Sequence, residues 1–363
     1  MIEVKLVKYR QAETELLDLF RASFNRDMNP DFWNWKHAGN YLSPVDPEVI
    51  VAMDKGRIVG ARPFMFVEMW LGEEKIKAAQ HVDTMVHPEY QGKGLFNIMG
   101  QYSLEYLKEN GYALSYGFSN TLSRRGFLKQ GYRVIGPLDF MFKVLRSRNM
   151  MLRYLKNELL GSLAGTCFDR VFVKKPKALS GLPDTFNFIT ADQYIIEELK
   201  DVDALRDRKA INLVRNEKFL RWRYDTHPHF KYKYIVLKRK EELVGYAVIS
   251  ARKEGSGLTH GLILDFLVKD NDSDCFRVLQ DKCYKELDQL GCDYMNIWMV
   301  CQLNQMNKLL KRSRFRSVVK FPFKKHYSDH LLDAILIQEQ MAELINIYDK
   351  ESWRLSAAFS DTR

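Results

Sequence analysis

The stretch HPEYQGKGLFN, from His87 to Asn97, joins a strand-like segment to a helical one. Residues 76–86 (IKAAQHVDTMV) predict the strand, and apolar side chains recur after it with helical spacing at Leu95, Ile98, Met99, Tyr102 and Leu107. Glycines at such a junction let the backbone approach a phosphate without an obstructing Cβ. The unpaired N–H groups of the helix start and its dipole favour an anion there. We therefore predict a phosphate-binding turn, although it is neither a GxxxxGK[ST] nor a GxGxxG motif.

The chain also contains an internal repeat. The cluster FWNWK (32–36) precedes two strand-like segments, and FLRWR (219–223) precedes two similar ones. Further along, residues 78–86 correspond to 261–268, which aligns Asp83 with Asp265. Each following amphipathic helix ends before a glycine, as expected of helix C-termini. Two copies of this order predict an α/β fold, with an α+β mixed sheet flanked by helices.

The repeat predicts four regions. Residues 1–144 form the first domain, and residues 185–345 form the second copy. Residues 145–184 form a basic, amphipathic connector, and residues 346–363 form a C-terminal tail.

The glycine-rich turn resembles motif A of the GNAT superfamily of N-acetyltransferases, a strand followed by V-x-P-x-x, Q/R-x-x-G-x-G/A and a helix. Val86, Pro88, Gln91 and Gly94 match, and Phe96 replaces the final small residue. The downstream segments YALSYGFSN (112–120) and TLSRRGFLKQGYR (121–133) resemble a second superfamily motif, matching Asn120, Lys129, Gly131 and Tyr132. The resemblance implies two tandem GNAT-like domains, of which the second is degenerate.

This resemblance also implies a site for acetyl-CoA as co-substrate. The strand edge would pair with the pantetheine amides, as an added strand does, and an N–H group near Thr84 or Met85 would polarise the thioester. Asn120 would contact the pantetheine arm. The cofactor-binding residues would be Met85, Val86, Gln91, Gly92, Lys93, Gly94, Leu95, Phe96, Asn97 and Asn120, with the N–H groups of 92–97 on the pyrophosphate.

The second copy lacks the glycine-rich turn. Residues 269–274 read KDNDSD, with three carboxylates and no glycine. These carboxylates would repel a pyrophosphate, so we expect one acyl-CoA site per chain.

The catalytic groups are less clearly marked. In the superfamily the acid is often a tyrosine, and Phe127 occupies that position here without a proton to donate. Tyr116 is the candidate acid that we retain, with Ser123 and Tyr90 as alternatives. His81 and Asp83 share one face of their predicted strand by alternation, so either is a candidate base.

We expect an acyltransferase that moves an acetyl or short acyl group from acetyl-CoA to an amine of a small molecule or amino sugar. One alternative is a non-catalytic acyl-CoA-binding scaffold, which the phenylalanine at position 127 would explain. The other is an aminoacyl transferase of the cell-wall-building type, which also has tandem copies of this fold but usually lacks a glycine-rich coenzyme loop.

Charge and cysteine content bear on partners and location. The net charge of +10 is concentrated in residues 140–178 and 308–325, which suggests an anionic or nucleotide-linked sugar acceptor, or peripheral contact with an anionic membrane surface. No nucleic-acid motif accompanies these tracts, so we expect no nucleic acid partner. Five cysteines without a CxxC pair argue against a metal site, and with no signal-like start they favour a cytoplasmic location.

Overall fold

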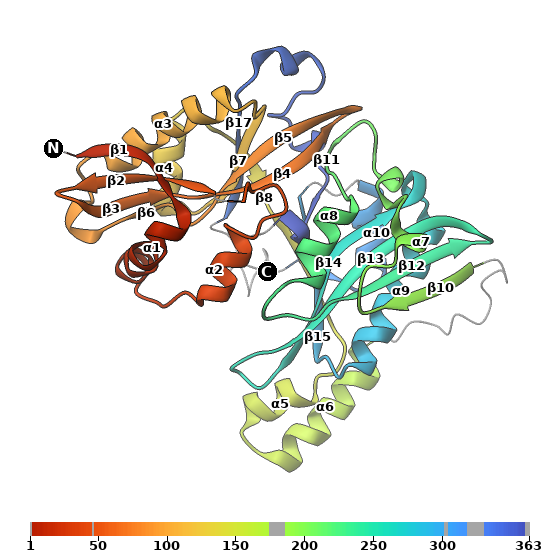
Figure 1. The fold of residues 1–363 in the computed structure, drawn as a ribbon. Helices are drawn as coiled ribbons and strands as arrows, with labels where there is room; N and C mark the ends of the chain where they lie inside the picture. The colour runs from red at the N-terminus through yellow and green to blue at the C-terminus, as the bar shows by residue number, and fades with distance from the viewer. Residues whose placement is uncertain (1, 46, 174–185, 301–303, 318–329, 360–363) are drawn as a thin grey trace.

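The computed structural model describes residues 2–45, 47–173, 186–300, 304–317 and 330–359. Two bodies of strands and helices lie side by side, and a pair of helices projects from the second (Figure 1). This is the mixed α/β architecture that the repeat predicted, with curled sheets that hold both parallel and antiparallel strands.

The first body contains two sheets and four helices. α3 buries Leu95, Met99 and Leu107 of the predicted apolar face, whereas Ile98, also predicted there, is 49% exposed. Its elements are β1 (Glu3–Lys8), α1 (Tyr9–Phe24), α2 (Pro30–Lys36), β2 (Glu48–Asp54), β3 (Arg57–Arg62), β4 (Phe64–Leu71), β5 (Glu74–His81), β6 (Met85–Val86), α3 (Leu95–Glu109), β7 (Leu114–Ser119), α4 (Thr121–Lys129) and β8 (Arg133–Pro137).

The second copy repeats much of this order around one larger sheet, except that its short strand at residues 211–213 pairs with β4 of the first body. Its helix α9 ends before Gly291 as α3 ends before Gly111, and both glycines have positive φ (79° and 75°), as predicted. The elements are β10 (Phe186–Ala191), α7 (Ile196–Leu199), β11 (Ile211–Leu213), α8 (Glu217–Leu220), β12 (Lys233–Arg239), β13 (Glu242–Lys253), β14 (Thr259–Val268), α9 (Ser273–Gln289), β15 (Tyr294–Val300), α10 (Asn304–Arg312) and β16 (Arg316–Ser317).

The two bodies exchange their final strands. β9 (Asp139–Val144) follows β8 in the chain but lies between β15 and β16 in the second sheet. Reciprocally, β17 (Leu331–Leu336) belongs to the second copy but lies between β7 and β8 (Figure 1). The predicted boundaries at 144 and 345 therefore do not follow the hydrogen bonding. The six-stranded sheet of the first body contains β11 and β17 from the second copy, and the sheet of the second body contains β9 from the first.

The segment expected as a C-terminal tail packs into the second body. β18 (Leu355–Ser356) pairs with β15, and the side chain of Trp353 is completely buried. Within the segment predicted as a tail, the described residues 353–358 thus lie against the folded core. The apolar side chains of Trp353, Leu355, Ala357 and Ala358 lose their contact with water there, which holds the segment in place.

The aromatic clusters of the two copies contact each other reciprocally. The rings of Trp35 and Trp222 stack with centroids 4.9 Å apart. Each indole N–H donates to the backbone carbonyl of the other residue, at 2.9 and 3.0 Å. The tryptophans are therefore core residues that join the two copies.

His227 lies against this stack, with its ring centroid 4.4 Å from that of Trp35, and its Nδ1 accepts the N–H groups of His229 and Phe230. Burial, with the nearby Arg223 and Arg252, lowers the pKa of His227 to about 2. The folded chain thus keeps this imidazole neutral where the unfolded chain binds a proton.

The free energy of unfolding should therefore fall as the pH falls below about 6.5, by up to about 1.4 kcal/mol per pH unit for this one proton. Urea unfolding at a series of pH values measures the slope. We expect His227→Gln to lose the part of the pH dependence that comes from this one proton. His229→Gln, at an exposed histidine, should keep the pH dependence of the parent chain. Equal slopes for His227→Gln and the parent chain would contradict this account.

Candidate functional site

A gap opens where two parallel strands of the first body separate. Residues 78–80 of β5 pair in parallel with residues 114–116 of β7. The chain then turns away from β7, and the next strand, β6, pairs with β3 instead. The bend falls at Asp83, whose φ of 44° interrupts the strand predicted to run continuously through residues 76–86.

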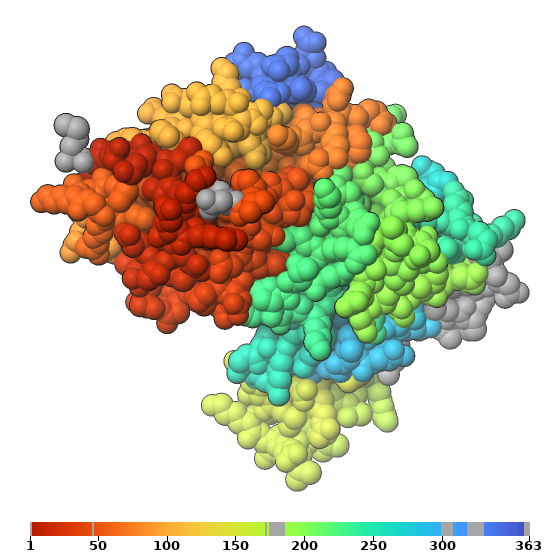
Figure 2. Space-filling view, in the orientation of Figure 1, coloured from red at the N-terminus to blue at the C-terminus, as the bar shows by residue number. Residues whose placement is uncertain are grey.

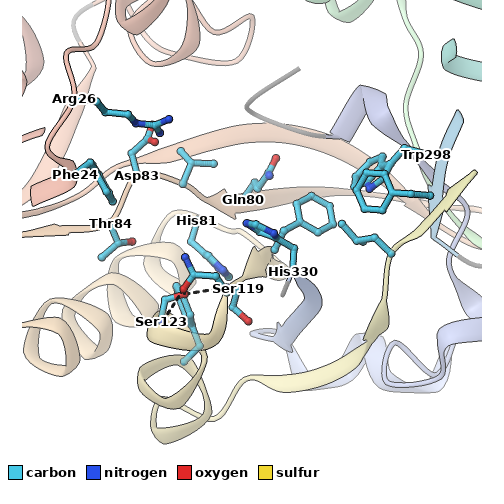
Figure 3. Close-up of a pocket in the computed structure, with 16 residues that line it drawn as sticks. Phe24, Arg26, Gln80, His81, Asp83, Thr84, Ser119, Ser123, Trp298 and His330 are labelled. Atoms are coloured by element: carbon cyan, nitrogen blue, oxygen red, sulfur yellow. Dashed lines mark hydrogen bonds between the residues drawn. The ribbon is translucent and has the colours of Figure 1, made fainter. Parts of the chain in front are cut away.

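This gap is a cavity of about 270 Å³ with walls from both bodies (Figure 3). The first body contributes His81, Asp83 and Asn120, and the second contributes Trp298 and His330. The space beside the last residues of β7 is thus open to a ligand.

The glycine-rich turn follows directly after β6. Gly92 and Gly94 have φ values of 77° and 81°, in a region that favours glycine, and a Cβ on either would meet nothing within 4 Å. Gly94 is the N-cap of α3, and no side chain of the described residues caps this helix. The exposed helix start fits an anionic group, and the nearby Lys93 lies 4.4 Å above the ring of Tyr90.

The predicted cofactor-binding residues are brought together as one strip. Met85 and Val86 form β6 at the edge of the gap, and residues 91–97 continue into the turn and helix start. The Gln91 amide donates to the Val86 carbonyl at 3.3 Å, which ties the turn to the strand. These residues present backbone groups where the pantetheine and pyrophosphate of a coenzyme would bind.

Phe96 occupies the motif position where a small residue is usual, and the structure explains how it fits. Its ring faces α4, where a Cβ on Gly126 would lie only 2.4 Å from the ring. The ring also packs against Phe127, with centroids 5.1 Å apart. The small residue Gly126 on α4 thus makes room for the large Phe96 ring on α3, and the ring points away from the glycine-rich turn toward α4.

Asp83 is held in a buried ion pair. Its carboxylate lies 2.5 Å from Lys36 Nζ and 3.4 Å from His37 Nε2. Burial alone would raise the pKa of Asp83, but Lys36 and His37 outweigh it and hold the pKa well below its usual range. Burial also lowers the pKa of His37. A carboxylate held this way is a weak base, so the structure favours a structural role for Asp83.

His81 meets a residue from the exchanged strand. Its Nε2 lies 3.2 Å from Oδ1 of Asp333 in β17, and both side chains are buried. The ring stacks on Phe127 and lies over Gly117, where a Cβ would come within 2.0 Å of Nε2. Asp333 also accepts the N–H of Ser119 at 3.2 Å. The carboxylate therefore links the imidazole to the strand that borders the gap.

A buried polar network surrounds this pair. The Tyr132 hydroxyl lies 2.7 Å from Ser115 Oγ and accepts a hydrogen bond from Arg62 at 3.4 Å. Arg62 is fully buried, which lowers the pKa of its guanidinium, while Tyr132 and Asp333 act in the opposite direction. Tyr132 thus contacts both the Arg62 guanidinium and the His81 ring.

The candidate acids differ in position. Tyr116 is completely buried in the core, with its hydroxyl 3.4 Å from the Gln80 amide oxygen, and it is not among the described residues lining the cavity. The structure therefore does not bring Tyr116 to the gap as we had expected. Ser123 lines the cavity beside Asn120, which caps α4 by accepting the N–H groups of Leu122 and Ser123.

The corresponding gap in the second body is closed by its own chain. β14 and β15 pair in parallel only up to Ile263 and Ile297, and beyond that point β18 pairs with β15 on the side that β14 has left. Ser356 then donates to Asp265, the counterpart of Asp83. A peptide strand thus occupies the place that stays open in the first body.

The helix start of the second copy is also closed to anions. Asp272 caps α9 by accepting the N–H groups of Asp274 and Cys275 at 2.7 and 3.1 Å. A carboxylate of the protein therefore takes the place where a pyrophosphate would bind. Both features agree with one coenzyme site per chain.

The fold and gap define a class of protein with two tandem α/β domains and one open strand–helix site. Residues 4–135 match the family model described as an acetyltransferase (GNAT) domain. No curated protein matched in sequence.

Solved structures with the same fold span almost the whole chain. A GCN5-related N-acetyltransferase from Anabaena variabilis ATCC 29413 is 12% identical with a TM-score of 0.63, covering 94% of this chain and 74% of its own. A tandem GNAT protein from the clavulanic acid biosynthesis pathway is 11% identical with a TM-score of 0.56, covering 93% and 99%. Eis1 from Mycobacterium abscessus is 12% identical with a TM-score of 0.55, covering 94% and 75%. The chain thus has the tandem GNAT fold.

The described residues contain neither a membrane-spanning helix nor a metal-binding cluster. No helix among them is both long and apolar enough to span a membrane. No cluster of three or more His, Cys, Asp or Glu side chains in the same residues has the geometry of a metal site.

The sequence analysis missed Asp333, Trp298 and His330. All three lie in the second copy, and Asp333 reaches the first body only through the exchanged strand. A single buried aspartate in an apolar strand, LLDAIL, was the available signal.

Proposed function

We propose that the chain is an acetyl-CoA-dependent N-acyltransferase with one active site, in the first body, acting on a small amine. The observation that carries this proposal is the contrast between the two copies. The first has an open gap and a helix start without a side-chain cap, and the second has both positions filled by its own residues. A protein that had lost coenzyme binding altogether would have no reason to keep only one copy open.

The amine would bind in the cavity between the two bodies. Phe140 and Trp298 give it an aromatic wall, and Asn120, Ser123 and Arg26 add polar groups. Its volume suits a small molecule or an amino sugar. Arg26 is exposed at this site and would attract an acceptor that carries a phosphate or carboxylate, such as a nucleotide-linked sugar. The predicted cytoplasmic location is part of this proposal, and the free thiol of Cys167 agrees with it.

His81 would act as the base, with Asp333 as a positioning residue. His81 accepts a proton from the amine as the nitrogen forms its bond to the thioester carbon, and the C–S bond then breaks. The proton held by His81 balances the charge of the released thiolate. A carboxylate beside the imidazole fixes the ring and stabilises its protonated form. The backbone N–H near Thr84 or Met85 would stabilise the oxyanion.

Release of free thiol from acetyl-CoA, screened against a panel of amines and amino sugars, tests the proposal. We expect at least one amine to give turnover in the parent chain and none to do so in Gly94→Asp, because a side chain and a negative charge then occupy the helix start. Gly257→Asp is the matched control, since Gly257 also has positive φ (83°) with no neighbour within 4 Å.

Two other results would replace this function. Binding of acetyl-CoA without turnover of any amine would indicate the non-catalytic scaffold. Displacement of acetyl-CoA by aminoacyl-tRNA would indicate an aminoacyl transferase of the cell-wall-building type.

A further inference from the structure

The helical hairpin formed by α5 (Arg148–Leu155) and α6 (Glu158–Phe172) stands away from the rest of the molecule (Figures 1 and 2). Its two helices pack through glycine. A Cβ on Gly161 would lie 2.7 Å from Leu152 Cα, and a Cβ on Gly165 would lie 2.6 Å from Arg148 Cα. Since backbone packs on backbone, the hairpin does not need its large apolar side chains to hold itself together.

Its base is fixed to the second body. Arg146 Nε donates to the Asp288 carboxylate at 3.0 Å, and the Arg146 backbone N–H donates to the Asp293 carbonyl at 2.9 Å. Asn149 donates to Asp293 at 2.8 Å. The hairpin is therefore a built element with a defined orientation.

The apolar side chains of the hairpin point to solvent. Leu159 is 78% exposed, Leu163 is 65% exposed and Tyr154 is 84% exposed. Leu155 and Leu160 are exposed beside them. We call these five residues the apolar tip. Such a concentration of exposed large apolar residues on one projecting element marks an interaction surface.

Basic residues are exposed on the hairpin, with Arg153 and Lys156 beside the apolar tip and Arg148 and Arg170 nearer the base. The acidic residues of the hairpin are Glu158 and Asp169, and the latter is engaged at the base. Leucines with a tyrosine and adjoining cations match the headgroup region of an anionic bilayer, where apolar side chains enter the acyl boundary and cations stay with phosphates.

We propose that the α5/α6 hairpin binds the surface of an anionic lipid bilayer through the apolar tip. The charge selects this partner over a second copy of the chain, because two copies facing each other would bring like charges together. The surface is separate from the coenzyme site, so this inference does not depend on the proposed function. It would place the second body against the membrane and leave the cavity of the first body in solution.

Co-sedimentation with vesicles tests the proposal. We expect the full chain to bind phosphatidylcholine vesicles that contain phosphatidylserine, and to bind pure phosphatidylcholine much more weakly. Raising the salt concentration should weaken binding to the anionic vesicles. The double variant Leu159→Asp, Leu163→Asp should lower the affinity by about tenfold or more, because two buried apolar contacts are lost. Leu344→Asp, at a leucine 46% exposed outside the hairpin, should bind like the parent.

Thermal unfolding of each variant confirms that it is folded, since the substituted side chains are exposed. Failure of the parent chain to bind anionic vesicles at low salt would overturn the proposal. So would equal binding by the double variant. A dimer in analytical ultracentrifugation that the double variant abolishes would assign the apolar tip to self-association instead.

Discussion

Replacing His81 with glutamine is expected to lower kcat for acyl transfer by about 10²–10⁴-fold, the usual contribution of a positioned base. Glutamine is polar and fits above Gly117, but it cannot take the proton that the amine loses. The measurement is thiol release from acetyl-CoA with the amine that the screen identifies. Binding of acetyl-CoA should be unchanged, because the proposed pyrophosphate contacts come from the backbone N–H groups of residues 92–97.

Asp333→Asn tests whether the second copy supports this base. Asparagine can still accept the Ser119 N–H, so the strand contact remains while the charge 3.2 Å from His81 is removed. We expect a smaller loss of kcat than for His81→Gln and a shift of the acidic limb of kcat/KM to lower pH, because the imidazolium loses its neighbouring carboxylate. A purely structural role would leave the pH profile unmoved. An unchanged kcat in His81→Gln would remove His81 from the mechanism.

The second large effect concerns stability and the pair of Arg215 with Asp265. The guanidinium donates two hydrogen bonds to the carboxylate, at 2.7 and 2.8 Å, and the side chains are 1% and 0% exposed. Arg215→Met leaves the carboxylate buried without its counter-charge. We expect the free energy of unfolding to fall by about 3–5 kcal/mol, measured by urea denaturation.

Two comparisons separate charge from packing. Arg277→Met removes an exposed pair with Asp274 and should cost at most about 1 kcal/mol. Combining Arg215→Met with Asp265→Leu removes both charges and should recover much of the lost stability, because replacing both partners of a buried pair by apolar residues is often neutral. A double variant as unstable as Arg215→Met would show that the loss comes from packing.

The local features of the fold were predictable from the sequence. The glycine turn needs two residues with positive φ and an apolar helix face after it, and both patterns are visible in QGKGLF and the residues that follow. The repeat was visible because both copies keep the same tryptophan, and Trp35 and Trp222 do form a reciprocal contact.

The exchange of β9 and β17 was not predictable. Each strand has the apolar pattern of a core strand, and that pattern is satisfied equally well in either sheet. The partner is decided by long-range packing of the two bodies, which leaves no local signal. The position of Asp333 beside His81 follows from this exchange. The sequence could therefore predict only those residues of the candidate site that come from the first copy.

The surroundings of Asp83 were not predictable for a related reason. Alternation places His81 and Asp83 on one face only if the strand continues, and the left-handed conformation at Asp83 ends that regularity. The carboxylate instead meets Lys36 and His37, residues from the end of α2 that the strand pattern could not indicate.

Calorimetric titration of the chain with acetyl-CoA tests the central claim most directly. The account predicts one molecule bound per chain, with binding lost in Gly94→Asp and kept in Gly257→Asp, because the coenzyme binds at the glycine turn of the first copy only. Two molecules per chain, or undiminished binding by a folded Gly94→Asp variant, would contradict it.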